Sequence, residues 1–105
     1  MQVKDVLVEA KNLMVDRGWI QRNYVTGEGF CSLGALDEVV MKKFYGDFIT
    51  DDEAAFLVEE ARFTLERSLK AKGRVTNVAA WNDARHRTFQ DVRDLFDDAA
   101  RVAGA

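Results

Sequence analysis

The chain contains no proline, and its apolar residues recur at intervals of three and four positions over most of its length. Such spacing places apolar side chains on one face of an α-helix, and no residue removes a backbone donor from the interior of a helix. Glycines and helix-capping residues stand between the periodic stretches. The pattern therefore predicts an all-α fold, a compact bundle of about five helices with a short hairpin or loop after the first helix.

The first half of the chain predicts two helices separated by this hairpin or loop. The first helix is expected over Val3–Arg17 and ends at Gly18, which can adopt the left-handed conformation that closes helices. The helical period is then lost, and the turn cluster at residues 26–29 indicates a short hairpin or an irregular loop. The second helix opens with Ser32 as its N-cap and runs to about Tyr45.

The third helix has the clearest start. In the segment Thr50-Asp51-Asp52-Glu53 the hydroxyl and the last carboxylate can each satisfy a free backbone donor, and the helix is expected to reach about Lys72. Phe56 and Phe63 fall opposite its main apolar stripe, which is formed by Ala54, Val58, Ala61, Leu65 and Leu69. Either neighbouring helices cover this helix on both sides, or the two rings form a surface for a partner protein or for a second copy of the chain.

The end of the chain offers a second candidate surface. A short fourth helix, capped by Thr76 or Asn77, stops near Asn82–Asp83. Thr88 then caps the last helix with an aspartate three positions on. The outward carboxylates of this last helix form either a solvated face or a docking site for a basic partner; they belong to Asp91, Asp94 and Asp98.

The segment Trp81–Thr88 brings polar, charged and aromatic groups into one short connection. In a structural interpretation, Trp81 fills the core, Asn82 caps a helix end, and Asp83 pairs with Arg85 or Arg87. In a functional interpretation, the segment lines a polar recess that recognises an anion, a nucleotide or a peptide. The residues of this candidate recess are Asn82, Asp83, Arg85, His86 and Arg87.

Catalytic and metal-binding signatures are weak in this sequence. Cys31 and His86, with Asn82 or Asp83, have the residue types of a cysteine-nucleophile triad. Cys31 nevertheless follows Phe30 in an apolar stretch typical of buried, inert thiols. One cysteine and one histidine are too few for a structural zinc site, and no glycine-rich phosphate loop is present. We therefore expect a protein that is not an enzyme and uses no cofactor.

The composition limits the classes of partner and the cellular compartment that are expected for this chain. A chain of 105 residues, 48% of them hydrophobic, suits one core and predicts a single domain over residues 1–105. The formal net charge of −3 argues against nucleic acid as a partner. No apolar run approaches the roughly 20 residues that span a bilayer, and a lone cysteine suits a reducing compartment. A cytoplasmic protein without membrane contact is expected.

Four blocks of the sequence resemble those of a known family. In chain order they are Gly18-Trp19, Cys31-Ser32-Leu33-Gly34-Ala35-Leu36, Trp81-Asn82-Asp83, and Arg87-Thr88 with Val92 downstream. Together they resemble a family of small proteins of unknown function in actinobacteria and their phages. The resemblance covers most of the chain and implies a source, but no reaction.

These observations predict a non-enzymatic phage or prophage protein that acts through contact with another protein, either a host factor or a second copy of itself. The contact is expected on the Phe56/Phe63 side or on the acidic face of the last helix. The alternative is a module that binds a small ligand, a nucleotide or nucleic acid through the segment Trp81–Thr88.

Overall fold

The computed structural model describes residues 1–104, which form five helices and one two-stranded hairpin. The helices are α1 (Val3–Arg17), α2 (Ser32–Tyr45), α3 (Asp51–Ala71), α4 (Val78–Asn82) and α5 (Phe89–Ala103), and the strands are β1 (Val25–Thr26) and β2 (Gly29–Phe30). The expected all-α bundle is confirmed. Of the two alternatives for the segment after the first helix, the antiparallel hairpin is the one formed.

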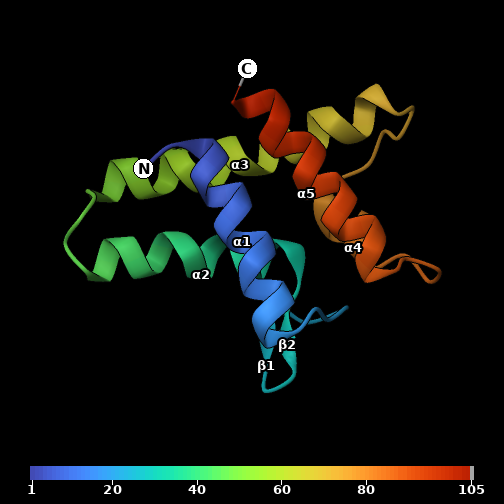
Figure 1. Cartoon of the computed structure of the whole chain (residues 1–105), viewed down its shortest axis with the longest axis horizontal. Helices are drawn as coiled ribbons and strands as arrows, with labels where there is room; N and C mark the ends of the chain where they lie inside the picture. The colour runs from blue at the N-terminus through green and yellow to red at the C-terminus, as the bar shows by residue number, and fades with distance from the viewer. Residues whose placement is uncertain (105) are drawn as a thin grey trace.

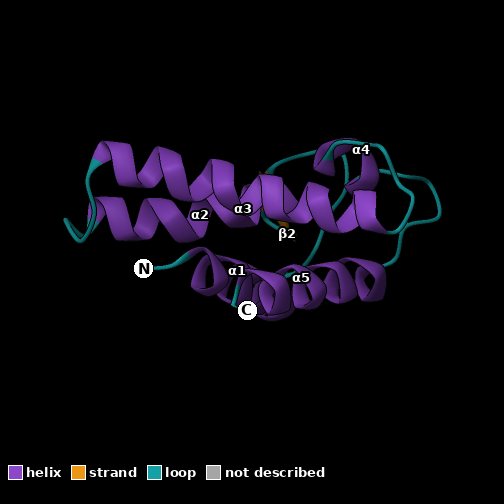
Figure 2. Cartoon of the chain, turned by 90° about the horizontal axis from the view of Figure 1, so that it is seen from above, coloured by secondary structure: helices purple, strands orange, loops and turns teal. Residues whose placement is uncertain are grey.

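The four long helices form two layers that cross each other. Helices α2 and α3 lie side by side in one layer, and α1 and α5 make up the other (Figure 1). Figure 2 shows the two layers edge-on, with α4 at one end of the α2–α3 layer. Helix α5 is antiparallel to α1: Gly104, just after the last turn of α5, lies close to the side chain of Lys4 near the start of α1. Since residues 1–104 form only two layers, each layer buries its inner side against the other, and its outer side has no second layer packed on it.

The core fills the space between the layers and draws on every long helix. Its largest fully buried side chains include Leu7, Met14, Leu36, Leu65, Leu69, Leu95 and Phe96. Burying one such side chain stabilises a fold by about 1.5–3 kcal/mol. Because each apolar stripe is covered by residues of other helices, the helices depend on one another for stability.

The outer side of α3 differs from one sequence-based interpretation. Its buried side consists of Leu57, Ala61, Thr64, Leu65 and Leu69. The side chains of Phe56 and Phe63 are 59% and 43% exposed, so the interpretation that neighbours cover α3 on both sides is wrong. The physical reason is that the fold of residues 1–104 has two layers of helices (Figure 2), so no third layer covers the residues of α3 that face away from the core.

The start of α2 also differs from the expectation. Cys31, and not Ser32, is the N-cap, and its Sγ accepts a hydrogen bond from the N–H of Gly34 at 3.3 Å. Ser32 is the first residue of the helix and is fully buried. Its hydroxyl donates to a distant acceptor, Asn82 Oδ1, at 2.6 Å. Capping preferences depend on residue type alone, so they cannot predict that a distant acceptor will bind the Ser32 hydroxyl.

The remaining helix starts follow the sequence closely. Of the two expected caps for α4, Asn77 is the one used. At α5 the capping box is complete, since Asp91 N donates to Thr88 Oγ1 at 3.2 Å and Thr88 N donates to Asp91 Oδ2 at 3.0 Å. At α3 the Thr50 hydroxyl accepts from Glu53 N at 3.2 Å, while no reciprocal bond from Thr50 N to the Glu53 side chain forms among residues 1–104. Only half of that expected box is therefore formed.

Three glycines allow the hairpin to approach the helices. A Cβ at Gly18 would lie 2.1 Å from Glu28 O, and one at Gly29 would lie 2.3 Å from Gly18 O. A Cβ at Gly34, within α2, would lie 2.2 Å from Tyr24 O. Gly18 ends α1 with φ +110° and ψ 152°, which is a positive φ but not the left-handed helical conformation expected. Backbone contact without side chains fixes the hairpin in place.

Candidate functional site

Asn82, one of the residues of the predicted recess, lies in the interior with 1% of its surface exposed. Its Oδ1 accepts hydrogen bonds from Trp19 Nε1 at 2.8 Å, Ser32 N at 3.0 Å and Ser32 Oγ at 2.6 Å. Its Nδ2 donates to Ile20 O at 3.2 Å and to Asp83 Oδ1 at 3.0 Å. Asn82 does not cap its own helix, whose C-cap is Asp83; it accepts instead from the N–H of Ser32, the first residue of α2. Asn82 and Asp83 line a small cavity, but the polar atoms of Asn82 are already bonded within the fold.

Asp83 joins the end of α4 to the segment that follows α1. Its Oδ1 accepts from the backbone N–H of Arg22 at 2.8 Å, and Gln21 Nε2 donates to two carbonyls of the same connection at 2.9 Å each. No ion pair between Asp83 and Arg85 or Arg87 is formed among residues 1–104, so the expected pairing is wrong. The carboxylate is instead used to hold two distant segments together.

Arg87 is held against the buried indole of Trp81. Its Nε donates to Trp81 O at 2.8 Å, and its guanidinium carbon lies 4.1 Å from the centre of the Trp81 ring. Burial lowers the pKa of Arg87 from its ordinary value, although an arginine remains charged in proteins. Arg85 and His86 are exposed. The fold thus separates the five predicted recess residues instead of gathering them.

The cysteine and the histidine are likewise kept apart by their environments. Cys31 is buried and caps α2, and burial raises the pKa of its thiol, which is the reverse of what activates a nucleophile. His86 is exposed, and no hydrogen bond within residues 1–104 joins the two. Over the same residues, no group of three or more His, Cys, Asp or Glu side chains can hold a metal ion. The described helices are also too short or too polar to cross a membrane.

The aromatic part of the expected partner surface lies on the outer face of α3. Phe56 and Phe63 are seven positions apart, about 10 Å along the helix. The Arg62 guanidinium carbon lies 4.6 Å from the centre of the Phe63 ring. Arg62 is held there by ion pairs with Glu59 at 2.7 Å and Glu66 at 3.1 Å. The Arg62 guanidinium therefore packs against one part of the Phe63 ring, and the residue remains 43% exposed.

A cavity of about 190 Å³ adjoins Phe63, and we call it the α3 slot; it is lined by Phe63, Glu66, Arg67, Lys70, Arg74, Val75 and Thr76. Val75, which also lines the slot, is 90% exposed. Glu66, the only carboxylate in the lining, is already bonded to Arg62 and to the N–H of Val78 at 3.1 Å. The slot therefore combines apolar walls with a rim of unneutralised positive charge.

The acidic part of the expected partner surface is largely used within the molecule. Asp98 is bonded to Lys72 and Arg101, and those hydrogen bonds lower the pKa of its carboxyl. Asp91 completes the capping box of α5, and the bond from the N-cap N–H lowers its pKa as well. Asp94 accepts from a neutral glutamine side chain at 2.8 Å. This face consequently offers less free negative charge than the sequence indicates.

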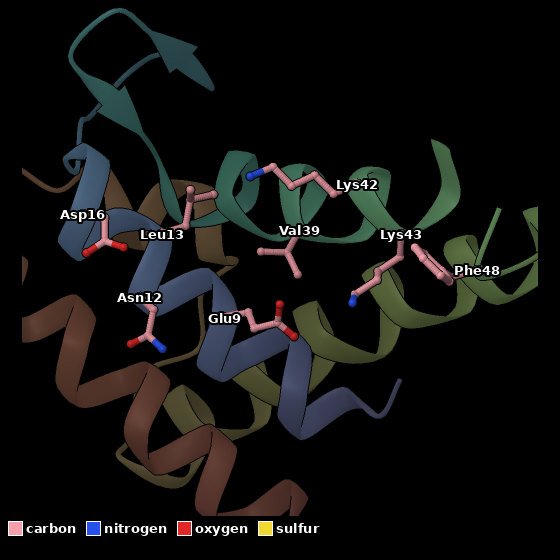
Figure 3. Close-up of a pocket in the computed structure, with 8 residues that line it drawn as sticks. All are labelled: Glu9, Asn12, Leu13, Asp16, Val39, Lys42, Lys43 and Phe48. Carbon is pink, nitrogen blue, oxygen red and sulfur yellow. The ribbon is translucent and has the colours of Figure 1, made fainter. Parts of the chain in front are cut away.

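A further cavity of about 450 Å³ lies between α1 and α2, away from every residue singled out in the sequence (Figure 3). Leu13 and Val39 form its apolar floor. Glu9 of α1 and Lys43 of α2 turn toward each other across the cavity, and no ion pair among residues 1–104 joins them. The remaining lining residues are Asn12, Asp16, Lys42 and Phe48. The sequence does not predict this groove, because charged residues at exposed helix positions are common and do not indicate that two helices form a cavity there.

Comparisons with known proteins address the family but not the chemistry. Neither the curated proteins nor the solved structures contain a match to the chain. A family model described as "Family of unknown function (DUF6197)" matches residues 1–102. The match spans almost the whole chain and includes all four residue blocks on which the resemblance rests. The chain therefore belongs to this family of unknown function.

Proposed function

We propose that this protein acts by binding another protein through the outer face of α3, and that it catalyses no reaction. The observation that carries the proposal is the exposed pair Phe56 and Phe63, at 59% and 43% exposure, beside the apolar α3 slot. Exposed aromatic side chains grouped with arginine are the residues that dominate binding energy at protein interfaces, and monomers seldom expose such apolar groups together.

Charge decides what kind of partner fits this surface. The slot is bordered by Arg67, Lys70 and Arg74, while its one carboxylate is neutralised by Arg62 and a backbone N–H. The matching partner is a protein segment that inserts an apolar side chain between Phe63 and Val75 and carries Asp or Glu beside it. A second copy of the chain fits less well, because its aspartates on α5 are mostly engaged in bonds of their own.

The proposed setting follows from the resemblance. Similarity to proteins of actinobacteria and their phages supports a phage or prophage origin and a host factor as the partner. The single buried cysteine supports a reducing compartment such as the cytoplasm. The raised pKa of the Cys31 thiol supports a role without catalysis.

The test uses three full-length proteins: the wild type, a Phe56→Ala/Phe63→Ala variant, and a Tyr45→Ala control that removes an aromatic ring of 75% exposure at the end of α2. Each is checked for folding by circular dichroism and is used to capture proteins from an actinobacterial lysate. A captured protein is then purified and its affinity is measured directly. We expect the double variant to weaken binding about thirtyfold and the control to bind like the wild type.

Two further measurements test the charge of this surface and the identity of its partner. Arg67→Glu/Lys70→Glu should also weaken binding, and added salt should weaken the wild type more than this variant. A strictly monomeric protein whose double variant retains every partner of the wild type would sink the proposal. A wild-type dimer that dissociates in the double variant would replace the host partner by a second copy of the chain.

A further inference from the structure

A second cavity, which we call the arginine recess, has a volume of about 380 Å³ and is lined by Gly73, Arg74, Val75, Thr76, Ala80, Trp81, Ala84 and Arg87. It lies where the loop between α3 and α4 meets the turn after α4. Two arginines contribute to its walls, and no carboxylate does. We propose that Arg74 and Arg87 bind the phosphate group of a small ligand in this recess. The recess adjoins the α3 slot and shares Arg74, Val75 and Thr76 with it, but Trp81 and Arg87 line the recess and not the slot.

Arg87 is already held in the position that binding requires. Its Nε bond to Trp81 O and its stacking on the indole leave the side chain only 14% exposed. The distance from Nη1 to Asp91 Oδ2 is 3.8 Å, longer than a hydrogen bond. Its terminal nitrogens therefore make no hydrogen bond among residues 1–104 and remain able to donate. A fixed, partly buried guanidinium loses little conformational freedom when it binds an anion.

Arg74 supplies the second positive charge. Its side chain is exposed and makes no hydrogen bond or ion pair among residues 1–104. Burial is the largest cause of the lowered pKa of Arg87, and the charge of Asp91 opposes it. The positive charge of Arg74, which repels that of Arg87, adds a smaller lowering. A dianion placed between the two groups relieves this repulsion. A phosphate monoester offsets both charges, whereas a carboxylate offsets only one.

One nearby carboxylate, Asp91, makes a long ion pair of 3.8 Å with Arg87 but does not line the recess. An adjoining cavity of about 280 Å³ shares Arg74, Trp81 and Arg87 with the recess and also contacts Lys72, Asp91 and Asp94. Asp91 is bonded to the backbone N–H of Thr88 at the start of α5. Asp94 accepts from a glutamine side chain on its own helix. Asp91 therefore offsets part of the charge of Arg87 from the side facing α5, while the lining of the recess itself contains two arginines and no carboxylate.

The walls also indicate the size and nature of the ligand. Val75, Ala80 and Ala84 provide apolar contact, and Thr76 provides a hydroxyl. A recess of a few hundred Å³ with apolar walls and a few polar groups is typical of sites for small molecules. The planar fork of arginine matches phosphate oxygens in pairs. A small phosphomonoester with a compact apolar body fits these features better than an extended polymer.

The experiment titrates inorganic phosphate and adenosine monophosphate into the full-length protein at constant ionic strength, with chloride as the comparison anion. Thermal stability and the NMR signal of the Arg87 Nε–H report binding. Variants are Arg74→Gln, which alters an exposed side chain, and the matched control Arg85→Gln outside the recess. We expect phosphate to raise Tm and shift the Arg87 signal, Arg74→Gln to weaken binding at least about tenfold, and Arg85→Gln to bind normally.

Further variants keep this site distinguishable from the partner surface. Arg67→Gln borders only the α3 slot and should bind phosphate normally. Arg87→Lys retains the charge but loses the fork and should bind more weakly. Absence of saturable binding up to about 10 mM phosphate would overturn the proposal, as would equal weakening by Arg74→Gln and Arg85→Gln. An oligonucleotide that binds more tightly than the monophosphate would indicate a nucleic-acid surface in its place.

Discussion

Replacing Asn82 by alanine tests whether the hydrogen bonds of its side chain stabilise the fold by linking the end of α4 to the start of α2 and to the segment after α1. The substitution removes five hydrogen bonds, three accepted by Oδ1 and two donated by Nδ2. It leaves the indole N–H of Trp19 and the backbone N–H of Ser32 without an acceptor, whereas the Ser32 hydroxyl, which loses its acceptor too, can rotate toward another partner. Ser32 is fully buried and Trp19 is half-buried, so water does not readily replace the lost partner.

The size of the effect of Asn82→Ala follows from these two donors. A buried donor left without a partner costs about 1–3 kcal/mol, so two cost about 2–6 kcal/mol. A water molecule that enters the vacated space recovers part of this loss. We therefore expect the free energy of unfolding to fall by about 3 kcal/mol. A chain of 105 residues has a total of about 5–15 kcal/mol, so the variant should still fold.

Equilibrium unfolding in urea, followed by circular dichroism and tryptophan fluorescence, measures this loss. Asn23→Ala is the matched control, because Asn23 is exposed and makes no side-chain hydrogen bond among residues 1–104; its effect should stay within about 0.5 kcal/mol. The dependence of stability on urea should be unchanged between variants. A difference of less than about 1 kcal/mol between Asn82→Ala and Asn23→Ala would refute the reasoning.

Two further predictions concern packing and pH. Gly34→Ala should lower the free energy of unfolding by about 2 kcal/mol or more in the same urea assay, because the added Cβ would lie 2.2 Å from Tyr24 O. Gly27→Ala is the control, since a Cβ at Gly27 would have nothing within 4 Å. Equal losses of stability in the two variants would contradict the predicted clash. The hydrogen bond from Lys72 lowers the pKa of Asp98 in the folded protein. The ionised Asp98 side chain therefore stabilises the fold fully above the unfolded-state pKa of about 4, and this stabilisation is lost as pH falls through the lower folded-state pKa. Asp98→Asn should therefore flatten the decline of Tm below about pH 4, and an unchanged slope would contradict the assignment.

The helices and their starts were predictable because the interactions that define them are local. The capping box of Thr88 and Asp91 joins residues three positions apart, so residue type and spacing are sufficient to recognise it. The placement of Phe56 and Phe63 on one side of α3 follows from helical periodicity in the same way. Whether another element covers that side depends on the number of layers in the bundle, and periodicity carries no information on this.

The candidate sites were less predictable because they depend on contacts between distant residues. Asn82 has the residue type of a helix cap, yet it accepts hydrogen bonds from Ser32, 50 positions away. Arg74 follows a helix whose negative end attracts cations, and only the packing of α4 places it beside Arg87. No local pattern distinguishes an arginine that closes a helix from one that lines a cavity.

The sequence by itself determined an all-α chain, the approximate bounds of its helices and an aromatic pair off the main apolar stripe of α3, since these follow from side-chain spacing along a helix. The tertiary structure alone decided which polar groups are consumed inside the molecule and which remain able to bind. Asn82 and Asp98 are bonded within the fold, whereas Phe56, Phe63 and Arg74 face outward. The physical reason is that burial and hydrogen-bond saturation depend on which surfaces meet when the two layers pack.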